Sequence, residues 1–316
     1  MDNLTHSLAG AVLGQIGLKK KTGLGMATLV IAANIPDIDA FATLVGGHQQ
    51  LGFRRGITHG PIAMLLLPIL LTGIIIAFDN WQMRRGKRPE SRLPLHKGWL
   101  LGLAYIGTLS HPALDFLNNY GIRLLEPFSS QWVYGDTLFI IDVWIWATLG
   151  IALWLSIRRE RRGAANWRTP AFSACALVLV YIAANGMISN RAEKMTAELV
   201  TEARGEQPEL VVANTLPIAF WARDMRWRGQ GEIGSGHFSL FGGDDRVSLN
   251  DDVRSDGMAA MDWESIAAED ADARAFLFWA RMPYVEAVDG RIWLRDQRFT
   301  FDGIGDRFRV DVTPEV

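Results

Sequence analysis

The sequence predicts an α-helical polytopic membrane domain of about six helices, followed by a small α+β soluble domain. Residues 1–190 contain nearly all the long apolar runs and carry 17 basic and 10 acidic side chains. Residues 191–316 carry 15 basic and 24 acidic side chains, and short alternating stretches replace the apolar runs. This change near residue 190 predicts two domains, 1–190 in the membrane and 191–316 outside it.

Run length predicts the membrane helices. A helix needs about 20 apolar residues to cross a bilayer, and four runs approach that length: 61–78, 98–117, 137–157 and 170–189. Two shorter stretches, 4–18 and 23–45, are interrupted by polar residues. By their length these two could be short or re-entrant helices, which completes the expected six.

Basic residues predict the orientation of these helices, because short cytoplasmic loops of membrane proteins collect Lys and Arg. They group in three segments, 19–21, 84–97 and 158–168. We expect these segments on the cytoplasmic side of a bacterial inner membrane, with the N-terminus and the C-terminal domain on the periplasmic side. Arg54 and Arg55 fall on the outer side of this arrangement, where they could hold an anionic group.

The C-terminal region has the patterns of a small α+β domain. Alternation over Phe238–Phe241 and Arg291–Phe301 predicts strands, and the pairs Asp289-Gly290 and Asp302-Gly303 predict turns. Residues 266–280 have the spacing of a helix. We expect this domain to lie on the periplasmic side of the membrane.

Acidic and histidine residues gather at the outer ends of the expected helices. A carboxylate inside a bilayer costs roughly 2.5–3.5 kcal/mol, so each such residue needs a partner. Seven residues share this placement: His6, Asp37, Asp39, His59, His111, Asp115 and Asp142. Each one alone is typical of a helix cap or a hydrogen-bonded interfacial residue, but their common placement predicts one divalent-metal site.

Local spacing supports this interpretation. His111 and Asp115 are four residues apart and therefore share one helical face. Pro36 interrupts the second helix just before Asp37 and Asp39, so that both carboxylates could point to one centre. Mixed imidazole and carboxylate ligands suit Zn²⁺, Mn²⁺ or Fe²⁺ better than Ca²⁺ or Mg²⁺. Because seven candidates exceed the ligands of one zinc ion, the site holds two metals or some residues orient the ligands.

The order of these motifs resembles the bacterial family of membrane-bound metal-dependent hydrolases that includes LexA-regulated inner-membrane proteins. Over roughly residues 1–145 the chain has Thr5-His6, Pro36-Asp-Ile-Asp39, Arg55-Gly-Ile-Thr-His59, Leu109-Ser-His-Pro-Ala-Leu-Asp115, Tyr120-Gly-Ile-Arg-Leu-Leu-Glu-Pro-Phe-Ser129 and then Asp142. The resemblance implies a helical membrane hydrolase that is distantly similar to zinc-dependent phospholipases C. Many members have His where this chain has Arg54, so one possible ligand is missing.

These observations predict a membrane-embedded hydrolase that acts at the outer interface on a lipid-like ester or phosphoester through metal-activated water. We expect Asp39, His59 and Arg55 to act in catalysis, zinc to be the cofactor with manganese or iron as alternatives, and membrane lipids but no nucleic acid to be partners. Two alternatives stay open: a metal-binding membrane scaffold and a proton-coupled transporter. The chain has no Gly-x-Ser-x-Gly or Walker motif.

Overall fold

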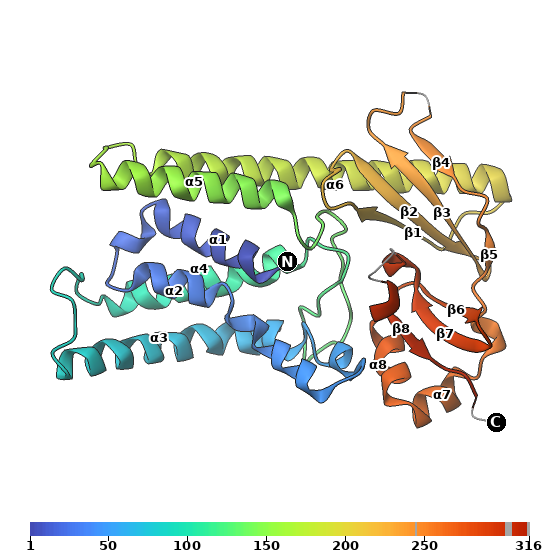
Figure 1. Cartoon of the computed structure of the whole chain (residues 1–316), viewed down its shortest axis with the longest axis horizontal. Coiled ribbons are helices and arrows are strands. Elements are labelled where there is room, and N and C mark those ends of the chain that lie inside the picture. The colour runs from blue at the N-terminus through green and yellow to red at the C-terminus, as the bar shows by residue number, and fades with distance from the viewer. Residues whose placement is uncertain (244, 301–304, 315–316) are drawn as a thin grey trace. The chain divides into compact units, whose positions relative to one another are not determined.

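The computed structural model describes residues 1–243, 245–300 and 305–314. These residues form two compact units (Figure 1). The helical unit consists of Met1–Asp39 and Arg55–Ala184, and the C-terminal unit consists of Ala40–Arg54 and Asn185–Val316. The expected turn at Asp302-Gly303 and the end of the expected strand at Phe301 lie outside the described residues.

The helical unit is built from α-helices, with long connections between α2 and α3 and between α4 and α5 (Figure 1). They are α1 (Asn3–Gln15), α2 (Gly25–Ala32), α3 (Pro61–Arg84), α4 (Lys97–Asp115), α5 (Val143–Arg161) and the first part of α6 (Thr169–Arg204). Asp2 caps α1 by accepting hydrogen bonds from the amides of Leu4 and Thr5. Pro61 occupies the first turn of α3, where its missing N–H costs no helical hydrogen bond.

Close packing of α2 against α1 and α4 depends on two glycines. A Cβ at Gly107 of α4 would lie 2.6 Å from the Cβ of Ala32, and one at Gly10 of α1 would lie 2.8 Å from the carbonyl oxygen of Leu29. The backbones can therefore approach more closely than larger residues would permit. This packing buries Ala33 beside α4, where its carbonyl group faces the candidate site.

Two helices in the described part of the chain are long and apolar enough to cross a membrane, α3 and α6. The prediction of about six membrane spans was therefore wrong. The first two stretches form helices of only 13 and 8 residues, well short of a bilayer's thickness. The runs 98–117 and 137–157 form α4 and α5 of 19 residues each, and polar and basic side chains within α4 and at the end of α5 dilute their hydropathy.

The C-terminal unit contains two antiparallel sheets. The first has the order β1-β2-β3-β4, with β5 also paired to β3. Its strands are β1 (Leu210–Thr215), β2 (Ala222–Gly229), β3 (Glu232–Ser239), β4 (Val247–Leu249) and β5 (Arg254–Ser255). The second has the order β6-β7-β8, with β6 (Pro283–Val288), β7 (Arg291–Asp296) and β8 (Arg309–Asp311).

Local sequence explains several features of this unit. Asp289 and Gly290 both have positive φ and form the two-residue turn between β6 and β7, as the Asp-Gly pair predicts. The expected helix over 266–280 is divided into α7 (Trp263–Glu269) and α8 (Ala271–Trp279). The division falls at Asp270, whose carboxylate accepts hydrogen bonds from the first amides of α8.

The segment 40–54 leaves the helical unit and packs on α8 of the C-terminal unit. The imidazole of His48 meets the Phe276 ring edge-on, with the ring centres 5.7 Å apart, and Leu51 is buried. Its two flanking residues stay in the helical unit, where the Arg55 amide donates a 2.7 Å hydrogen bond to the Asp39 carboxylate. This hydrogen bond joins the two ends of the segment, where the chain leaves the helical unit and returns to it.

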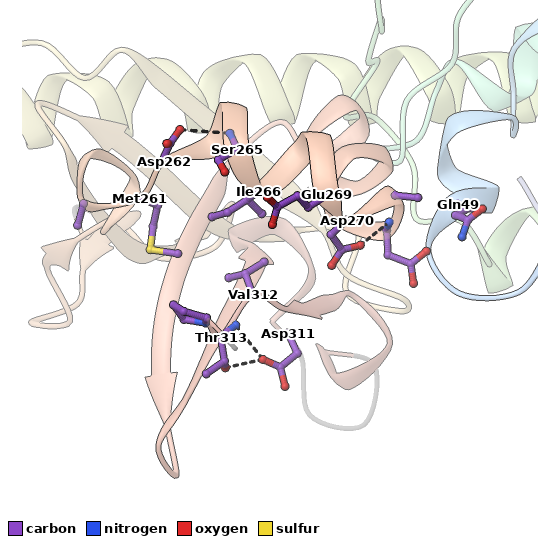
Figure 2. A pocket seen from close by; sticks show the side chains of 14 residues that line it. Gln49, Met261, Asp262, Ser265, Ile266, Glu269, Asp270, Asp311, Val312 and Thr313 are labelled. Atoms are coloured by element: carbon purple, nitrogen blue, oxygen red, sulfur yellow. Dashed lines mark hydrogen bonds between the residues drawn. The ribbon is translucent and has the colours of Figure 1, made fainter. Parts of the chain in front are cut away.

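A pocket of about 980 Å³ lies in the C-terminal unit among α7, α8, β8 and Gln49 (Figure 2). Three of its carboxylates have local partners, since Asp262 and Asp270 cap helices and Asp311 accepts hydrogen bonds from Thr313. No histidine, cysteine, lysine or arginine lines it. The mixed imidazole and carboxylate set that the sequence predicts is therefore not found in this pocket.

Candidate metal centre

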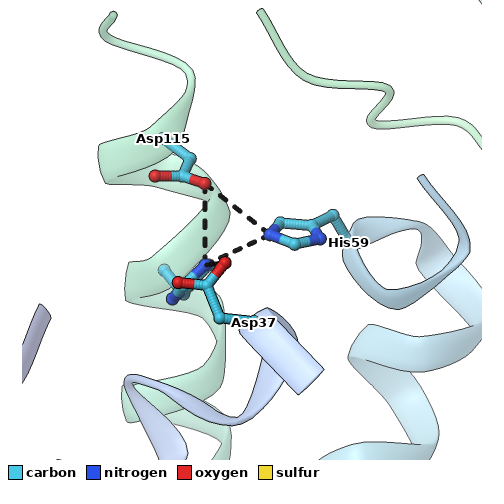
Figure 3. Close-up of side chains that lie close together, drawn as sticks. Asp37, His59 and Asp115 are labelled. Atoms are coloured by element: carbon cyan, nitrogen blue, oxygen red, sulfur yellow. Dashed lines mark hydrogen bonds and ion pairs between the residues drawn. The ribbon is translucent and has the colours of Figure 1, made fainter. Parts of the chain in front are cut away.

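Four side chains of the helical unit bring their ligand atoms within 4.8 Å of one another: Asp37, His59, His111 and Asp115. The Nε2 atoms of His59 and His111 are 3.1 Å apart, and the Oδ2 atom of Asp115 is 3.6 Å from each of them (Figure 3). Asp37 Oδ1 lies 3.7 Å from His111 Nε2. Both imidazoles and Asp115 are fully buried or nearly so.

Three segments of the fold supply these residues. His111 and Asp115 lie one turn apart on α4 and share a face, as their spacing predicts. Asp37 lies in a 3₁₀ segment, Ile35–Val45, that begins shortly after α2 ends. His59 ends a 3₁₀ turn directly before α3. Gly60 follows it at a position where a Cβ would lie 1.9 Å from the carbonyl oxygen of Glu126, so only glycine fits there.

The partners of the two imidazoles determine which nitrogen carries the proton. His111 Nδ1 donates a 2.7 Å hydrogen bond to the carbonyl oxygen of Ala33. Thr58 Oγ1 donates to Asp39 Oδ2 over 3.0 Å, so it has no second proton and accepts from His59 Nδ1 over 2.9 Å. Both imidazoles thus carry hydrogen on Nδ1 and turn Nε2 toward the cluster.

Two imidazoles and two carboxylates meet in this centre, and the Met1 ammonium and the Arg55 guanidinium contact Asp115 from its edge. Burial lowers the pKa of His59, which disfavours the proton that could otherwise bridge the imidazoles. Burial opposes ionisation of Asp37, yet the adjacent His111 lowers the pKa of that carboxyl to about 2. Neutral imidazoles and ionised carboxylates are the protonation states that bind metal ions. The donor set therefore fits a divalent cation of the zinc, manganese or iron type.

Asp39 lies behind His59 and orients it through Thr58. Its Oδ2 atom accepts from Arg55 N and Thr58 Oγ1 and is 3.5 Å from His59 Nδ1. Such carboxylates behind a metal-bound histidine fix the ring and raise its basicity. The structure thus places Asp39 next to a candidate ligand, and the four-residue cluster does not include it.

Replacing Asp39 with asparagine should weaken metal binding roughly 10- to 100-fold, the usual effect of losing such an orienting carboxylate. Competition against a chromophoric chelator would measure this affinity in detergent-purified protein. An unchanged affinity would show that Asp39 does not orient His59.

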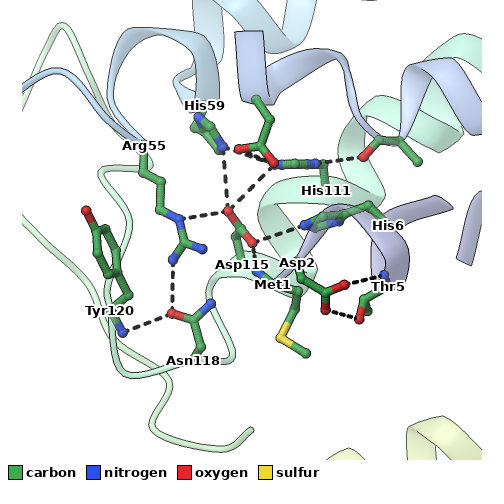
Figure 4. A network of polar contacts seen from close by, with 12 residues as sticks. Met1, Asp2, Thr5, His6, Arg55, His59, His111, Asp115, Asn118 and Tyr120 are labelled. Atoms are coloured by element: carbon green, nitrogen blue, oxygen red, sulfur yellow. Dashed lines mark hydrogen bonds and ion pairs between the residues drawn. The ribbon is translucent and has the colours of Figure 1, made fainter. Parts of the chain in front are cut away.

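Arg55 is enclosed beside Asp115 (Figure 4). Its Nε atom is 3.0 Å from Asp115 Oδ2, and its Nη1 atom donates to Asn118 Oδ1 and to the carbonyl oxygen of Gly121. The guanidinium group lies 4.7 Å from the centre of the Tyr120 ring. Through these contacts Arg55 pairs with the charge of Asp115, whereas from the sequence we expected it to hold an anionic group. Arg54, the other basic residue considered there, belongs to the C-terminal unit.

His6 joins the opposite side of Asp115. Its Nε2 atom is 3.2 Å from Asp115 Oδ1, and its ring stacks on that of His111 with centres 3.8 Å apart (Figure 4). Burial lowers the pKa of His6 to about 4, so its imidazole is neutral at neutral pH. Its Nδ1 atom is buried without a hydrogen-bond partner in the described structure. His6 therefore lies next to the cluster and extends the polar network toward α1.

Asp142 has a different place in the fold. Its Oδ1 atom caps α5 by accepting from the amides of Trp144 and Ile145, and its Oδ2 atom accepts a 3.0 Å hydrogen bond from Tyr181. The four-residue cluster found among the described residues does not contain it. An aspartate directly before an apolar helical run is also the usual signal of a helix cap.

Because Asp142 caps α5, its replacement should lower stability without changing metal binding. Replacing Asp142 with alanine should lower the free energy of unfolding by about 1 kcal/mol, the usual cost of losing a cap. Metal content should remain at the wild-type level, as measured by elemental analysis of the purified variant. Loss of metal from this variant would instead place Asp142 among the ligands.

Some partners in the centre were not among the predicted site residues. Thr58 and Asn118 are buried or half-buried hydrogen-bond partners of His59 and Arg55. Both lie in or beside the motifs that suggested the site, so their position was a usable signal. The role of the Ala33 carbonyl oxygen could not be predicted from the sequence, because every residue type offers the same backbone acceptor.

Comparison with protein families gave one result that bears on identity. The family model described as YdjM inner membrane protein matches residues 1–192, more than half of the chain. Comparison with curated proteins found no match, and comparison with solved structures found none either. The match covers every residue of the cluster described above and agrees with the resemblance to LexA-regulated inner-membrane proteins. The chain is a member of the YdjM inner membrane protein family.

Proposed function

We propose that this protein is a metal-dependent hydrolase of the inner membrane that acts on a lipid-like ester or phosphoester. The observation that carries the proposal is the clustering of the two imidazole Nε2 atoms, 3.1 Å apart, with the carboxylates of Asp37 and Asp115 within 4.8 Å of one another. A divalent cation held by these groups would be attracted to both carboxylates. When bound, such an ion lowers the pKa of coordinated water to about 7 and so supplies hydroxide at neutral pH.

The chain's own residues have distinct parts in this proposal. Asp37, His59, His111 and Asp115 would hold the ion, and zinc is the first choice because the donors are mixed nitrogen and oxygen. Thr58 and Asp39 keep the proton of His59 on Nδ1, which leaves Nε2 free to bind. Arg55 balances the charge of Asp115. The basic end of the helical unit would face the cytoplasm, which puts the centre at the periplasmic end.

A structural metal in a membrane scaffold is the second candidate. The cluster offers four protein ligands, which is the number that closes a structural zinc site, whereas catalytic zinc keeps one position for water. The two candidates differ in one measurable respect, because a scaffold needs the metal for stability and has no turnover.

Hydrolysis assays on metal-loaded and metal-stripped protein would separate these functions. We expect purified protein to cleave a phosphodiester or phospholipid substrate, to lose this activity with a chelator, and to regain it with Zn²⁺ or Mn²⁺. The Asp39→Asn variant should show reduced cleavage, and the Asp142→Ala variant should match wild type. Metal-dependent stability with no turnover on any ester or phosphoester would support the scaffold and contradict the hydrolase.

A further inference from the structure

The end of the helical unit away from the metal centre is strongly basic. The α1–α2, α3–α4 and α5–α6 connections lie together at this end, whereas His59 precedes α3 and Asp115 ends α4 at the other (Figure 1). Segments 19–21, 84–97 and 158–168 contain 14 lysines and arginines and two glutamates. A surface with this charge attracts polyanions or anionic lipid headgroups.

Within this surface, Trp167 forms the centre of a compact group of cations. The ammonium groups of Lys19 and Lys20 lie 5.3 and 4.8 Å from the centre of its ring, and the guanidinium of Arg168 lies 5.1 Å away. These distances are those of cation–π contacts, which hold the three charges close together. We call Lys19, Lys20, Glu160, Trp167 and Arg168 the Trp167 cluster.

Glu160 compensates only part of this charge. Its carboxylate pairs with Lys19 and, over 3.3 Å, with Lys20. Three cations and one anion leave two positive charges. The Lys20 side chain is 50% exposed and Arg168 is also exposed, so a ligand can reach both from outside.

Apolar surface begins immediately beside the cluster. Trp167 lies two residues before α6, one of the two candidate membrane spans, and Phe172 and Leu179 on that helix are 53% and 66% exposed. Other cation–tryptophan pairs lie at neighbouring helix ends, with Lys21 on Trp99 and Arg158 on Trp154. Tryptophan and basic residues at helix ends are typical of the interface between a bilayer and water.

We propose that the Trp167 cluster binds the headgroup of an anionic phospholipid. The phosphate group would lie against Lys20 and Arg168, and the acyl chains would follow the exposed apolar face of α6. A nucleic acid would use the charge but has no counterpart for the exposed phenylalanine and leucine side chains. The binding site is separate from the metal centre and does not depend on the proposed hydrolysis.

Native mass spectrometry of the full-length protein in nonionic detergent tests this proposal by titration with phosphatidylglycerol or phosphatidylcholine of matched acyl chains. Wild type should bind phosphatidylglycerol more than about tenfold more tightly, since each nearby cation contributes about fivefold. The triple variant Lys19→Gln, Lys20→Gln, Arg168→Gln should lose most of this preference. The control Arg191→Gln, Arg204→Gln, Arg291→Gln removes three exposed charges from the C-terminal unit and should keep it.

A second variant should bind phosphatidylglycerol more tightly, a result that misfolding cannot produce. Glu160→Gln removes the opposing carboxylate, so the affinity for phosphatidylglycerol should rise about fivefold while that for phosphatidylcholine stays constant. Equal affinity of wild type for the two lipids would overturn the proposal, as would equal losses in the two triple variants. Displacement of phosphatidylglycerol by a short DNA duplex would also overturn it, by showing that the surface binds nucleic acid.

Discussion

Replacing His111 with alanine should weaken metal binding roughly 100-fold, because one ligand of four contributes about a quarter of the 10–16 kcal/mol typical of a four-ligand zinc site. Thermal unfolding with and without a chelator measures this loss through the stability that bound metal adds to the folded protein. We expect a chelator to lower the melting temperature of wild type markedly and that of the variant only slightly.

The conservative control for this experiment is Asp142→Ala, which removes a buried carboxylate outside the cluster. Its melting temperature should be lower than that of wild type, but the chelator should lower it further by the wild-type amount. A His111→Ala protein that responds to the chelator as strongly as wild type would show that His111 is not a ligand.

Replacing Asp115 with asparagine should have the largest effect on stability. Asp115 is fully buried and contacts the Met1 ammonium, the Arg55 guanidinium, and three imidazoles, those of His6, His59 and His111. Loss of its charge leaves the buried guanidinium of Arg55 without its carboxylate, which costs about 3–5 kcal/mol in comparable buried pairs. The variant should also lose bound metal, since its amide can no longer supply an anionic ligand.

A double-mutant cycle separates the charge effect from simple loss of packing. Arg55→Met removes the unpaired guanidinium at similar side-chain length, so the Asp115→Asn, Arg55→Met protein should be more stable than the sum of the two single effects predicts. Chemical unfolding in detergent measures the three variants. Strictly additive losses would show that Arg55 and Asp115 do not interact energetically.

Part of the candidate site follows from residue type and spacing. His111 and Asp115 had to share a helical face, and a buried carboxylate needs a partner wherever the chain places it. The first rule pairs His111 with Asp115, whereas Asp37 and His59 were named only within a set of seven residues expected at one end of the helices. The two rules do not separate a ligand from an orienting or capping carboxylate, because Asp39 and Asp142 have the same chemistry as Asp37. That distinction depends on Thr58 and on the start of α5, which only the coordinates show.

The number of membrane spans was not predictable from composition alone. Apolar run length identified α3 and α6 but overestimated the membrane spans, because residues 137–142 are not helical and α2 ends after eight residues. Polar residues within α4 belong to the candidate metal centre, and they also lower its hydropathy. Nothing in the composition of residues 40–54 indicates that they pack on α8, since tertiary contacts such as that of His48 with Phe276 join positions far apart in the sequence.

The metal-to-protein ratio of the purified wild-type protein, measured by elemental analysis after loading with Zn²⁺ and removal of excess, tests the central claim most directly. The four-residue cluster offers imidazole nitrogens and carboxylate oxygens to a single cation, so we expect about one tightly held ion per chain and little in His111→Ala. Wild type without bound metal, or with the same content as that variant, would contradict this account.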